Sequence, residues 1–270
     1  HSAKLRASGD GVCLQCHARD KFDDVKHHHH VGPESQPTCN SRHMQTRTYR
    51  VVDPRHDRTF RVPRPDLSAK LGTPNDCNDC HRDKTAQWAA TAVEQWFGAD
   101  RKGFQTFGAG FHASRTDQAD AAALLGVIAA DNNVPAVARA SALSELASHV
   151  SPANINAARS GLSDPDPMVR IGALDMLANL PAAQIWPLAA PLLADPVRGV
   201  RIRTASLLAA VPVARQPQAD RAHFNQAAAE FVDAQRSNAE RPESRTTLAN
   251  FFAQRGQSAE AETEYRAALR

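Results

Sequence analysis

The stretch Val169-Arg-Ile-Gly-Ala-Leu-Asp-Met-Leu177 decides the fold of the second half of the chain. It aligns with Ala138-Arg-Ala-Ser-Ala-Leu-Ser-Glu-Leu146, which lies 31 residues earlier, and with Val200-Arg-Ile-Arg-Thr-Ala-Ser-Leu-Leu208, which lies 31 residues later. Apolar residues at positions i, i+3, i+4 and i+7 give each copy the buried stripe of an amphipathic helix. The period predicts HEAT-like helical pairs over residues 114–213, although it is short for that class.

A second position recurs with the same period. Asn133, Asp164 and Asp195 share one offset, and a proline follows each of the two aspartates. An aspartate can cap the free N–H groups of a helix, and proline is tolerated in the first turn. We therefore expect Asp-Pro to open a helix in each repeat.

A different period follows in the last part of the chain, over residues 214–270. Seven residues there fall at tetratricopeptide offsets: Leu248, Ala249, Phe252, Gly256, Ala261, Tyr265 and Ala268. A step of about 34 residues back reaches Ala227, Phe231 and Ala234. We expect tetratricopeptide-like pairs here, so that the second half forms an α-helical solenoid and the fold class is mostly α.

The first part of the chain has another composition. All five cysteines and ten of the twelve histidines lie between His1 and His112. The net charge of +3 does not by itself indicate a nucleic-acid partner, and no apolar run is long enough to span a membrane. The chain begins without Met and ends inside a repeat, so we expect a fragment of a longer protein with a distinct domain over residues 1–113.

Two segments of this domain share a pattern. Cys13-Leu-Gln-Cys16-His17 and Cys77-Asn-Asp-Cys80-His81 are both C-x-x-C-H, the attachment signature of c-type haem. Two thiols three positions apart can each form a thioether to a porphyrin vinyl group, and the next residue places an imidazole on the iron. The sequence thus predicts two haem c groups, with His17 and His81 as proximal ligands.

Two other interpretations stay open. Two C-x-x-C pairs can supply four thiolates to a zinc ion, but this leaves the histidine after each pair unexplained. Structural disulfides leave one cysteine over and explain no histidine.

The fifth cysteine lies in Cys39-Asn-Ser-Arg42-His43, where arginine stands at the second cysteine position. One thioether can still hold a haem, so we expect a third haem at Cys39 with His43 as its proximal ligand. The alternative is a free thiol beside a surface histidine.

A low-spin haem iron takes a second strong axial ligand. Candidates are the run from His27 through His28, His29 and His30, together with His112, His1, His56 and Met44. Adjacent histidines on a helix point about 100° apart, which follows from 3.6 residues per turn. The run could therefore serve two neighbouring haems.

Seven arginines lie between Arg42 and Arg64, in a stretch that also carries four prolines up to Pro74. Guanidinium groups bind carboxylates bidentately, so some of these arginines are candidates to balance haem propionates. The prolines predict extended chain and turns. Such an irregular domain suits a cofactor that supplies much of the buried apolar surface.

The run from Tyr49 to Ser68, followed by Leu71-Gly-Thr-Pro-Asn-Asp-Cys77-Asn-Asp-Cys80-His81, resembles a family of bacterial multihaem c-type cytochromes. In that family a haem domain precedes HEAT-like and tetratricopeptide repeats, and the proteins are exported. The resemblance implies a cysteine where this chain has Arg42 and a histidine at the position of Arg58. His56 lies two residues before that position.

The principal hypothesis is an exported multihaem cytochrome, periplasmic or extracellular, that carries electrons between its haems. Its helical repeats would dock a redox partner or further copies of the chain. A second hypothesis is a multihaem oxidoreductase that acts on a small nitrogen or sulfur compound at an open-coordinate haem. A third is a helical-repeat binding protein with a zinc-bound cap.

Overall fold

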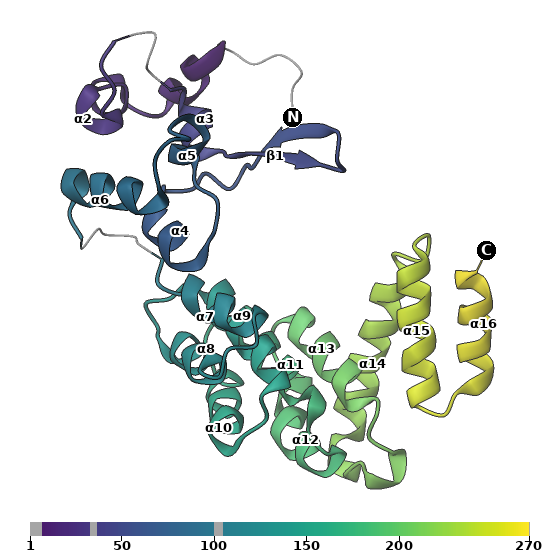
Figure 1. Cartoon of the computed structure of the whole chain (residues 1–270). Coiled ribbons are helices and arrows are strands. Elements are labelled where there is room, and N and C mark those ends of the chain that lie inside the picture. Colours follow the sequence, from purple (N-terminus) through teal and green to yellow (C-terminus); the bar gives the residue numbers. More distant parts are fainter. Residues whose placement is uncertain (1–6, 33–36, 100–104, 270) are drawn as a thin grey trace. The chain divides into compact units, whose positions relative to one another are not determined.

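The computed structural model describes residues 7–32, 37–99 and 105–269. Its described parts are mostly α-helical, with one two-stranded antiparallel hairpin (Figure 1). The chain divides into two compact units, residues 1–104 and 105–270. The predicted mostly-α class is confirmed, whereas the predicted division of the second half at residue 213 stays a prediction.

The first unit is built of short elements. In chain order they are η1 (Gly9–Gln15), α1 (Arg19–Phe22), α2 (Val25–His28), α3 (Cys39–His43), β1 (Thr46–Tyr49), β2 (Asp53–His56), α4 (Pro65–Leu71), α5 (Asp76–Cys80) and α6 (Ala86–Phe97).

Side-chain caps start three of these helices. The Thr38 hydroxyl accepts the Ser41 N–H at 3.3 Å before α3, and the Asn75 carbonyl oxygen accepts the Asn78 N–H at 3.2 Å before α5. Thr85 caps α6 in the same way. Caps of this kind satisfy N–H groups that have no partner within the helix. They explain why helices as short as α3 and α5 begin directly at the cysteine motifs.

The first unit has little apolar core. Among its described residues, the buried aliphatic side chains are those of Ala89, Ala90 and Val93, all on α6, which packs against α4. All five cysteines are free, so disulfides do not replace the missing core. Small domains without a sufficient core depend on disulfides, metals or other additions. This unit therefore lacks the usual internal means of holding a domain of its size together.

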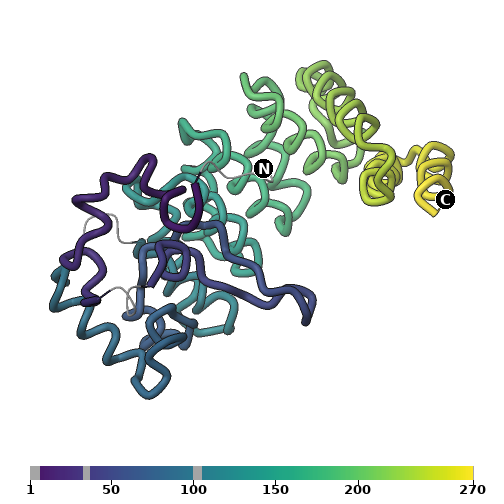
Figure 2. Tube along the Cα trace, turned by 90° about the horizontal axis from the view of Figure 1, so that it is seen from above, coloured from purple at the N-terminus to yellow at the C-terminus, as the bar shows by residue number. Residues whose placement is uncertain are grey.

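The second unit consists of helices in succession (Figure 2). They are α7 (Gly108–Arg115), α8 (Ala121–Ala130), α9 (Ala136–Glu145), η2 (Leu146–Ser148), α10 (Pro152–Gly161), α11 (Pro167–Met176), η3 (Leu177–Asn179), α12 (Ala182–Ala189), η4 (Ala190–Ala194), α13 (Arg198–Leu208), η5 (Val213–Arg215), η6 (Gln218–Asp220), α14 (Arg221–Arg236), α15 (Pro242–Gln254) and α16 (Ser258–Ala268).

The 31-residue period places equivalent side chains in one apolar core. Leu143 of α9, Leu174 of α11 and Ala205 of α13 are all fully buried, and α11 packs against both α9 and α13. Gly172 lets α11 approach α9 closely, because a Cβ atom at this position would overlap the carbonyl oxygen of Ala140. The periodic apolar stripe predicted from the sequence is therefore present.

A buried arginine links successive repeats. Arg170 on α11 pairs with Asp195, with a distance of 2.8 Å between Nε and Oδ2, and its Nη2 donates to Oδ1 at 2.9 Å. Its Nη1 donates to the backbone carbonyls of Asp164 at 2.8 Å and Pro165 at 3.1 Å. One guanidinium thus fixes the turn before its own helix and the turn of the next repeat.

The equivalent arginines repeat this arrangement. Arg139 pairs with Asp164, and Arg201 pairs with Glu230 at 2.8 Å. Arg201 also donates to the Asp195 carbonyl at 2.7 Å, as Arg170 does to the Asp164 carbonyl. We call this series of arginines and carboxylates the arginine ladder.

The ladder corrects the expectation that Asp164 and Asp195 cap helices. Helix α11 begins at Pro167, and its cap is Asp166, whose Oδ1 accepts the Met168 N–H at 2.8 Å. Helix α13 begins at Arg198 without a side-chain cap. The two recurrent aspartates instead accept from the arginine of the preceding repeat, a stronger contact because both partners are charged.

The last two helices, α15 and α16, pack against each other. Four of the residues at tetratricopeptide offsets are buried there, namely Leu248, Ala249, Phe252 and Ala261. Gly256 has φ = 75° between the helices, a left-handed conformation that glycine adopts without a steric penalty. The predicted helical pair is therefore present at this end of the chain.

Candidate functional site

The cysteine motifs of the first unit lie on three short helices that meet. Helix α3, which carries Cys39, contacts both η1 and α5. The Cys39 N–H donates to Oδ1 of Asp10 on η1 at 2.9 Å. Burial, the Asp10 carboxylate and the Cys13 thiol together raise the pKa of Cys39 to about 11. The Cys39 and Cys13 thiols are therefore neighbours, although 26 residues separate them in the sequence.

The thiols of the C-x-x-C-H motifs differ in exposure. Cys13 and Cys77 are partly buried, whereas Cys16 and Cys80 are exposed. Burial, with a smaller contribution from Asp76, raises the pKa of Cys77. Each motif thus holds one thiol at the protein surface and one against the helices.

The histidine run diverges because α2 ends within it. His28 is the last residue of α2, and His29 has φ = 54°, a left-handed conformation that turns the chain. His27 lies against His43 of α3, with ring centroids 6.1 Å apart and planes 21° apart. His30 lies against His81, with centroids 6.0 Å apart and planes 34° apart. One short segment thus reaches the histidine of two different motifs.

These separations suit two imidazoles that share one metal ion. An imidazole nitrogen binds a metal at about 2 Å, so two rings on opposite sides of one ion have centroids about 6 Å apart. The Nδ1 atom of His43 lies 2.9 Å from the Arg61 carbonyl oxygen, which can only accept. Nδ1 therefore carries the proton, and Nε2 of His43 is left as the metal-binding nitrogen, as is usual for ligating histidines.

The two middle histidines of the run have other surroundings. His28 is buried, its Nδ1 accepts the His30 N–H at 3.2 Å, and burial followed by the Arg42 charge lowers its pKa. His29 stacks on Trp96, with centroids 4.1 Å apart and planes 6° apart. Its Nε2 is buried without a hydrogen-bond partner. A buried imidazole nitrogen of this kind is open to a ligand.

Arg42 joins the third motif to the histidine run. Its Nη2 donates to the His28 carbonyl at 2.7 Å and also contacts Nδ1 of His30. Burial lowers the pKa of Arg42, and the thiols of Cys77 and Cys39 lie near enough to act on its charge. The residue that stands at the second cysteine position therefore holds α3 against the run.

The remaining candidate ligands are placed differently. The His17 ring meets Phe22 at 5.0 Å, and Phe22 meets His27 at 5.4 Å, so one aromatic ring joins His17 to the run. The Nδ1 atom of His56 lies 3.0 Å from the Met44 carbonyl oxygen, and its Nε2 lies 3.4 Å from the Asn40 amide.

Two candidates are not part of this cluster of described residues. His112 lies on α7, which packs against α8 in the second unit. His1 lies outside the residues that the structure describes. Their roles as distal ligands stay predictions.

Aromatic residues of the cluster were missed in the sequence. Trp88 lies 5.0 Å from His81 between ring centroids, and Trp96 covers His29. The two tryptophans are eight residues apart on α6, a spacing that places both on one face of a helix. This spacing beside a C-x-x-C-H motif is the signal that could have found them.

The histidines come together in pairs rather than in larger groups. Within residues 7–32, 37–99 and 105–269, no three His, Cys, Asp or Glu side chains are placed to hold a metal ion. Nor is any helix of these ranges long and apolar enough to cross a membrane.

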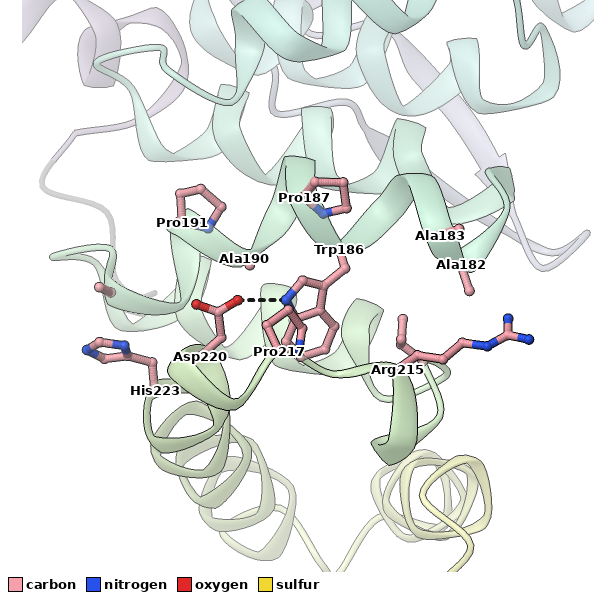
Figure 3. Close-up of a pocket in the computed structure, with 12 residues that line it drawn as sticks. Ala182, Ala183, Trp186, Pro187, Ala190, Pro191, Arg215, Pro217, Asp220 and His223 are labelled. Carbon is pink, nitrogen blue, oxygen red and sulfur yellow. Dashed lines mark hydrogen bonds between the residues drawn. The ribbon is translucent and has the colours of Figure 1, made fainter.

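The second unit contains a groove of about 670 Å³ between η4 and the segment that leads into α14 (Figure 3). Alanine and proline side chains form much of its lining. Its polar groups are already in part paired, because Nε1 of Trp186 donates to Oδ2 of Asp220 at 2.8 Å. We assign no chemistry to this groove.

Comparison with protein-family models, with curated proteins and with solved structures found no match to this chain.

Proposed function

We propose that the first unit is the haem domain of an exported multihaem c-type cytochrome, and that it carries electrons between covalently bound haems. The observation that carries the proposal is the pairing of motif histidines with the histidine run, at 6.1 Å for His43 with His27 and 6.0 Å for His81 with His30. Two protein ligands are what a haem iron requires, since the porphyrin supplies the remaining four nitrogens.

The thin apolar core of the first unit supports the same proposal. A porphyrin brings a large apolar surface, and thioether bonds keep it in place where the surrounding protein is sparse. Cys13 with Cys16 would anchor one haem, Cys77 with Cys80 a second, and Cys39 a third through one thioether. The haem supplies reversible one-electron chemistry when bound.

The protein's own residues would set the conditions for that chemistry. His27 and His30 would complete the axial ligation opposite His43 and His81, and the Arg61 carbonyl would orient the His43 ring. The Arg42 guanidinium would place positive charge between neighbouring sites. Positive charge beside a haem favours its reduced form, because the oxidised form carries one more positive charge.

The second unit would be an α-helical solenoid, HEAT-like over residues 114–213 and tetratricopeptide-like over 214–270. The arginine ladder and the α15–α16 pair support this proposal. Solenoids bind partners along an extended surface, so we propose docking of a redox partner or of further copies of the chain. We place the protein in the periplasm or outside the cell, because bacteria attach haem c outside the cytoplasm.

The paired histidines favour haem over a zinc cap, since structural zinc takes four protein ligands at one point. They also favour electron transfer over catalysis at an open iron, because His43 of the altered motif faces His27. We therefore keep the electron-transfer proposal alone.

The test is to express the chain with an export signal in a bacterium that attaches haem c, and to measure the intact mass. We expect at least two added haems. Replacing Cys13 and Cys16 by Ser, or Cys77 and Cys80 by Ser, should each remove one haem, and Cys39→Ser should remove a third. A polypeptide without added tetrapyrrole would refute the proposal.

Axial ligation is tested separately by electron paramagnetic resonance. His30→Ala should convert one low-spin haem to a high-spin form without changing the number of haems. His223→Ala in the second unit is the matched control and should leave the spectrum unchanged. An unchanged spectrum for His30→Ala would contradict its assignment as a ligand.

A further inference from the structure

The tip of the β1–β2 hairpin exposes large apolar side chains. Residues 50–52 join the strands, which pair in register with Tyr49 opposite Asp53. Val51 is 90% exposed and Val52 is 82% exposed, and Tyr49 beside them is 58% exposed. Nothing within the chain covers this tip.

The turn is also strained. Arg50 has φ = 48° and Val51 has φ = 72°. Hairpin turns with left-handed residues normally use Gly or Asn, and a β-branched residue there is unfavourable. Glycine at position 51 would suit the backbone better and would expose less apolar surface. The valine therefore adds neither turn geometry nor packing to the folded chain, which points to a contact outside it.

The hairpin has little support from the rest of its unit. Its strands pack almost only against each other, and seven of their eight residues are exposed. In both Figure 1 and Figure 2 it extends away from the helices of the first unit. An isolated two-stranded hairpin is at best marginally stable in water. A surface that receives the tip would stabilise it.

Arginines surround the apolar tip. Five of them are exposed along the hairpin and the segment that follows: Arg47, Arg50, Arg55, Arg58 and Arg61. The same segment carries two acidic residues, Asp53 and Asp57. Arg47 and Arg55 are directly opposite in the strand register, a like-charge pair that destabilises a hairpin in the absence of anions. The charge pattern is complementary to a negatively charged surface.

We propose that this hairpin docks the protein on an anionic phospholipid bilayer. Val51 and Val52 enter the boundary between headgroups and acyl chains, and Tyr49 lies among the headgroups, where aromatic rings are favoured. Arg47 and Arg50 contact lipid phosphates. A convex aliphatic tip with basic side chains behind it needs no complementary pocket, which favours a bilayer over an acidic protein.

The inference does not depend on the proposed haem chemistry. The hairpin leaves the cysteine cluster where the Asp57 N–H donates to the Gln45 carbonyl at 2.8 Å. Four residues per strand at about 3.3 Å each place the tip about 13 Å beyond that point. Lipid binding and haem attachment can therefore fail independently.

The experiment measures sedimentation of the full chain with vesicles of phosphatidylcholine, with and without phosphatidylglycerol. We expect binding only when phosphatidylglycerol is present, and release in high salt. Arg47→Gln with Arg50→Gln should weaken binding about fivefold for each arginine. Val51→Gly with Val52→Ser should weaken it about tenfold or more, because two apolar side chains no longer leave water.

The tip variants should fold, since glycine suits the left-handed backbone at position 51; circular dichroism checks this. Val127→Ser, at a 69% exposed valine of α8, and Arg236→Gln, at an exposed arginine of α14, are the matched controls and should bind like the parent. Equal binding to neutral vesicles, no binding, or binding unaffected by the tip variants would overturn the proposal. Self-association that the tip variants abolish, without vesicle binding, would assign the tip to a second copy and would also overturn it.

Discussion

Breaking one step of the arginine ladder should destabilise the second unit strongly. The side chains of Arg170 and Asp195 are only 11% and 7% exposed. Arg170→Met keeps a long side chain but leaves the Asp195 carboxylate buried without its cation. Removing one partner of a buried ion pair costs about 3–5 kcal/mol. The loss of the two backbone bonds to the Asp164 turn adds to this cost.

The pair formed by Arg266 and Glu262 is the matched control. It joins the same kinds of charge at 2.6 Å, but its side chains are 73% and 62% exposed. An exposed helical pair at this spacing contributes about 0.3–0.5 kcal/mol. Arg266→Met should therefore change the free energy of unfolding by roughly a tenth as much as Arg170→Met.

The assay is urea unfolding followed by far-ultraviolet circular dichroism, with hydrogen exchange over α11 and α13 to localise the effect. The double variant Arg170→Met with Asp195→Asn should recover part of the loss, because no charge is then left buried. If Arg170→Met and Arg266→Met had equal effects, or if the double variant were strictly additive, the reasoning would be wrong.

Three further predictions follow from single residues. Gly172→Ala should destabilise the second unit, as shown by its melting temperature, because the new methyl group overlaps the α9 backbone; Gly126→Ala, with open space around it, should instead stabilise α8 by up to about 1 kcal/mol. Burial, followed by the charge of a neighbouring carboxylate, raises the pKa of Asp76 to about 6, so its proton stabilises the folded state below pH 4 and that stabilisation is lost as the pH rises through 6. Asp76→Asn should therefore gain stability over the parent between pH 4 and pH 7 in urea titrations, and an unchanged difference would contradict the assignment. In the haem-free chain at pH 8, Cys39, with its pKa near 11, should react with iodoacetamide more slowly than the exposed Cys80 in peptide mass mapping, and equal rates would show that the thiol is not held as described.

The helical half was largely predictable because its signal is periodic. Leu143 and Leu174 lie on a stripe that the sequence repeats, and a repeated stripe requires a repeated packing partner. The ladder was not predicted, because Arg170 and Asp195 are 25 residues apart and only the packed repeats bring them together. Local propensity favoured Asp-Pro as a helix start, but a buried guanidinium outcompeted that role.

The candidate site was predictable in its residue types but not in its pairings. The C-x-x-C-H spacing marks Cys77 and His81 locally. Which histidine of the run meets which motif depends on the left-handed turn at His29, a conformation that histidine adopts infrequently. The contribution of Arg42 was equally hidden, because in sequence it reads only as a missing cysteine.

The arginine ladder makes the length of the second unit adjustable in fixed steps. Arg139 and Arg170 each pair with an aspartate 25 residues ahead, and the two pairs are themselves 31 residues apart. Excision or duplication of one such block joins an arginine to an equivalent aspartate, so no ion is stranded. Gene rearrangements of that size can therefore vary the reach of the protein while leaving every joint intact.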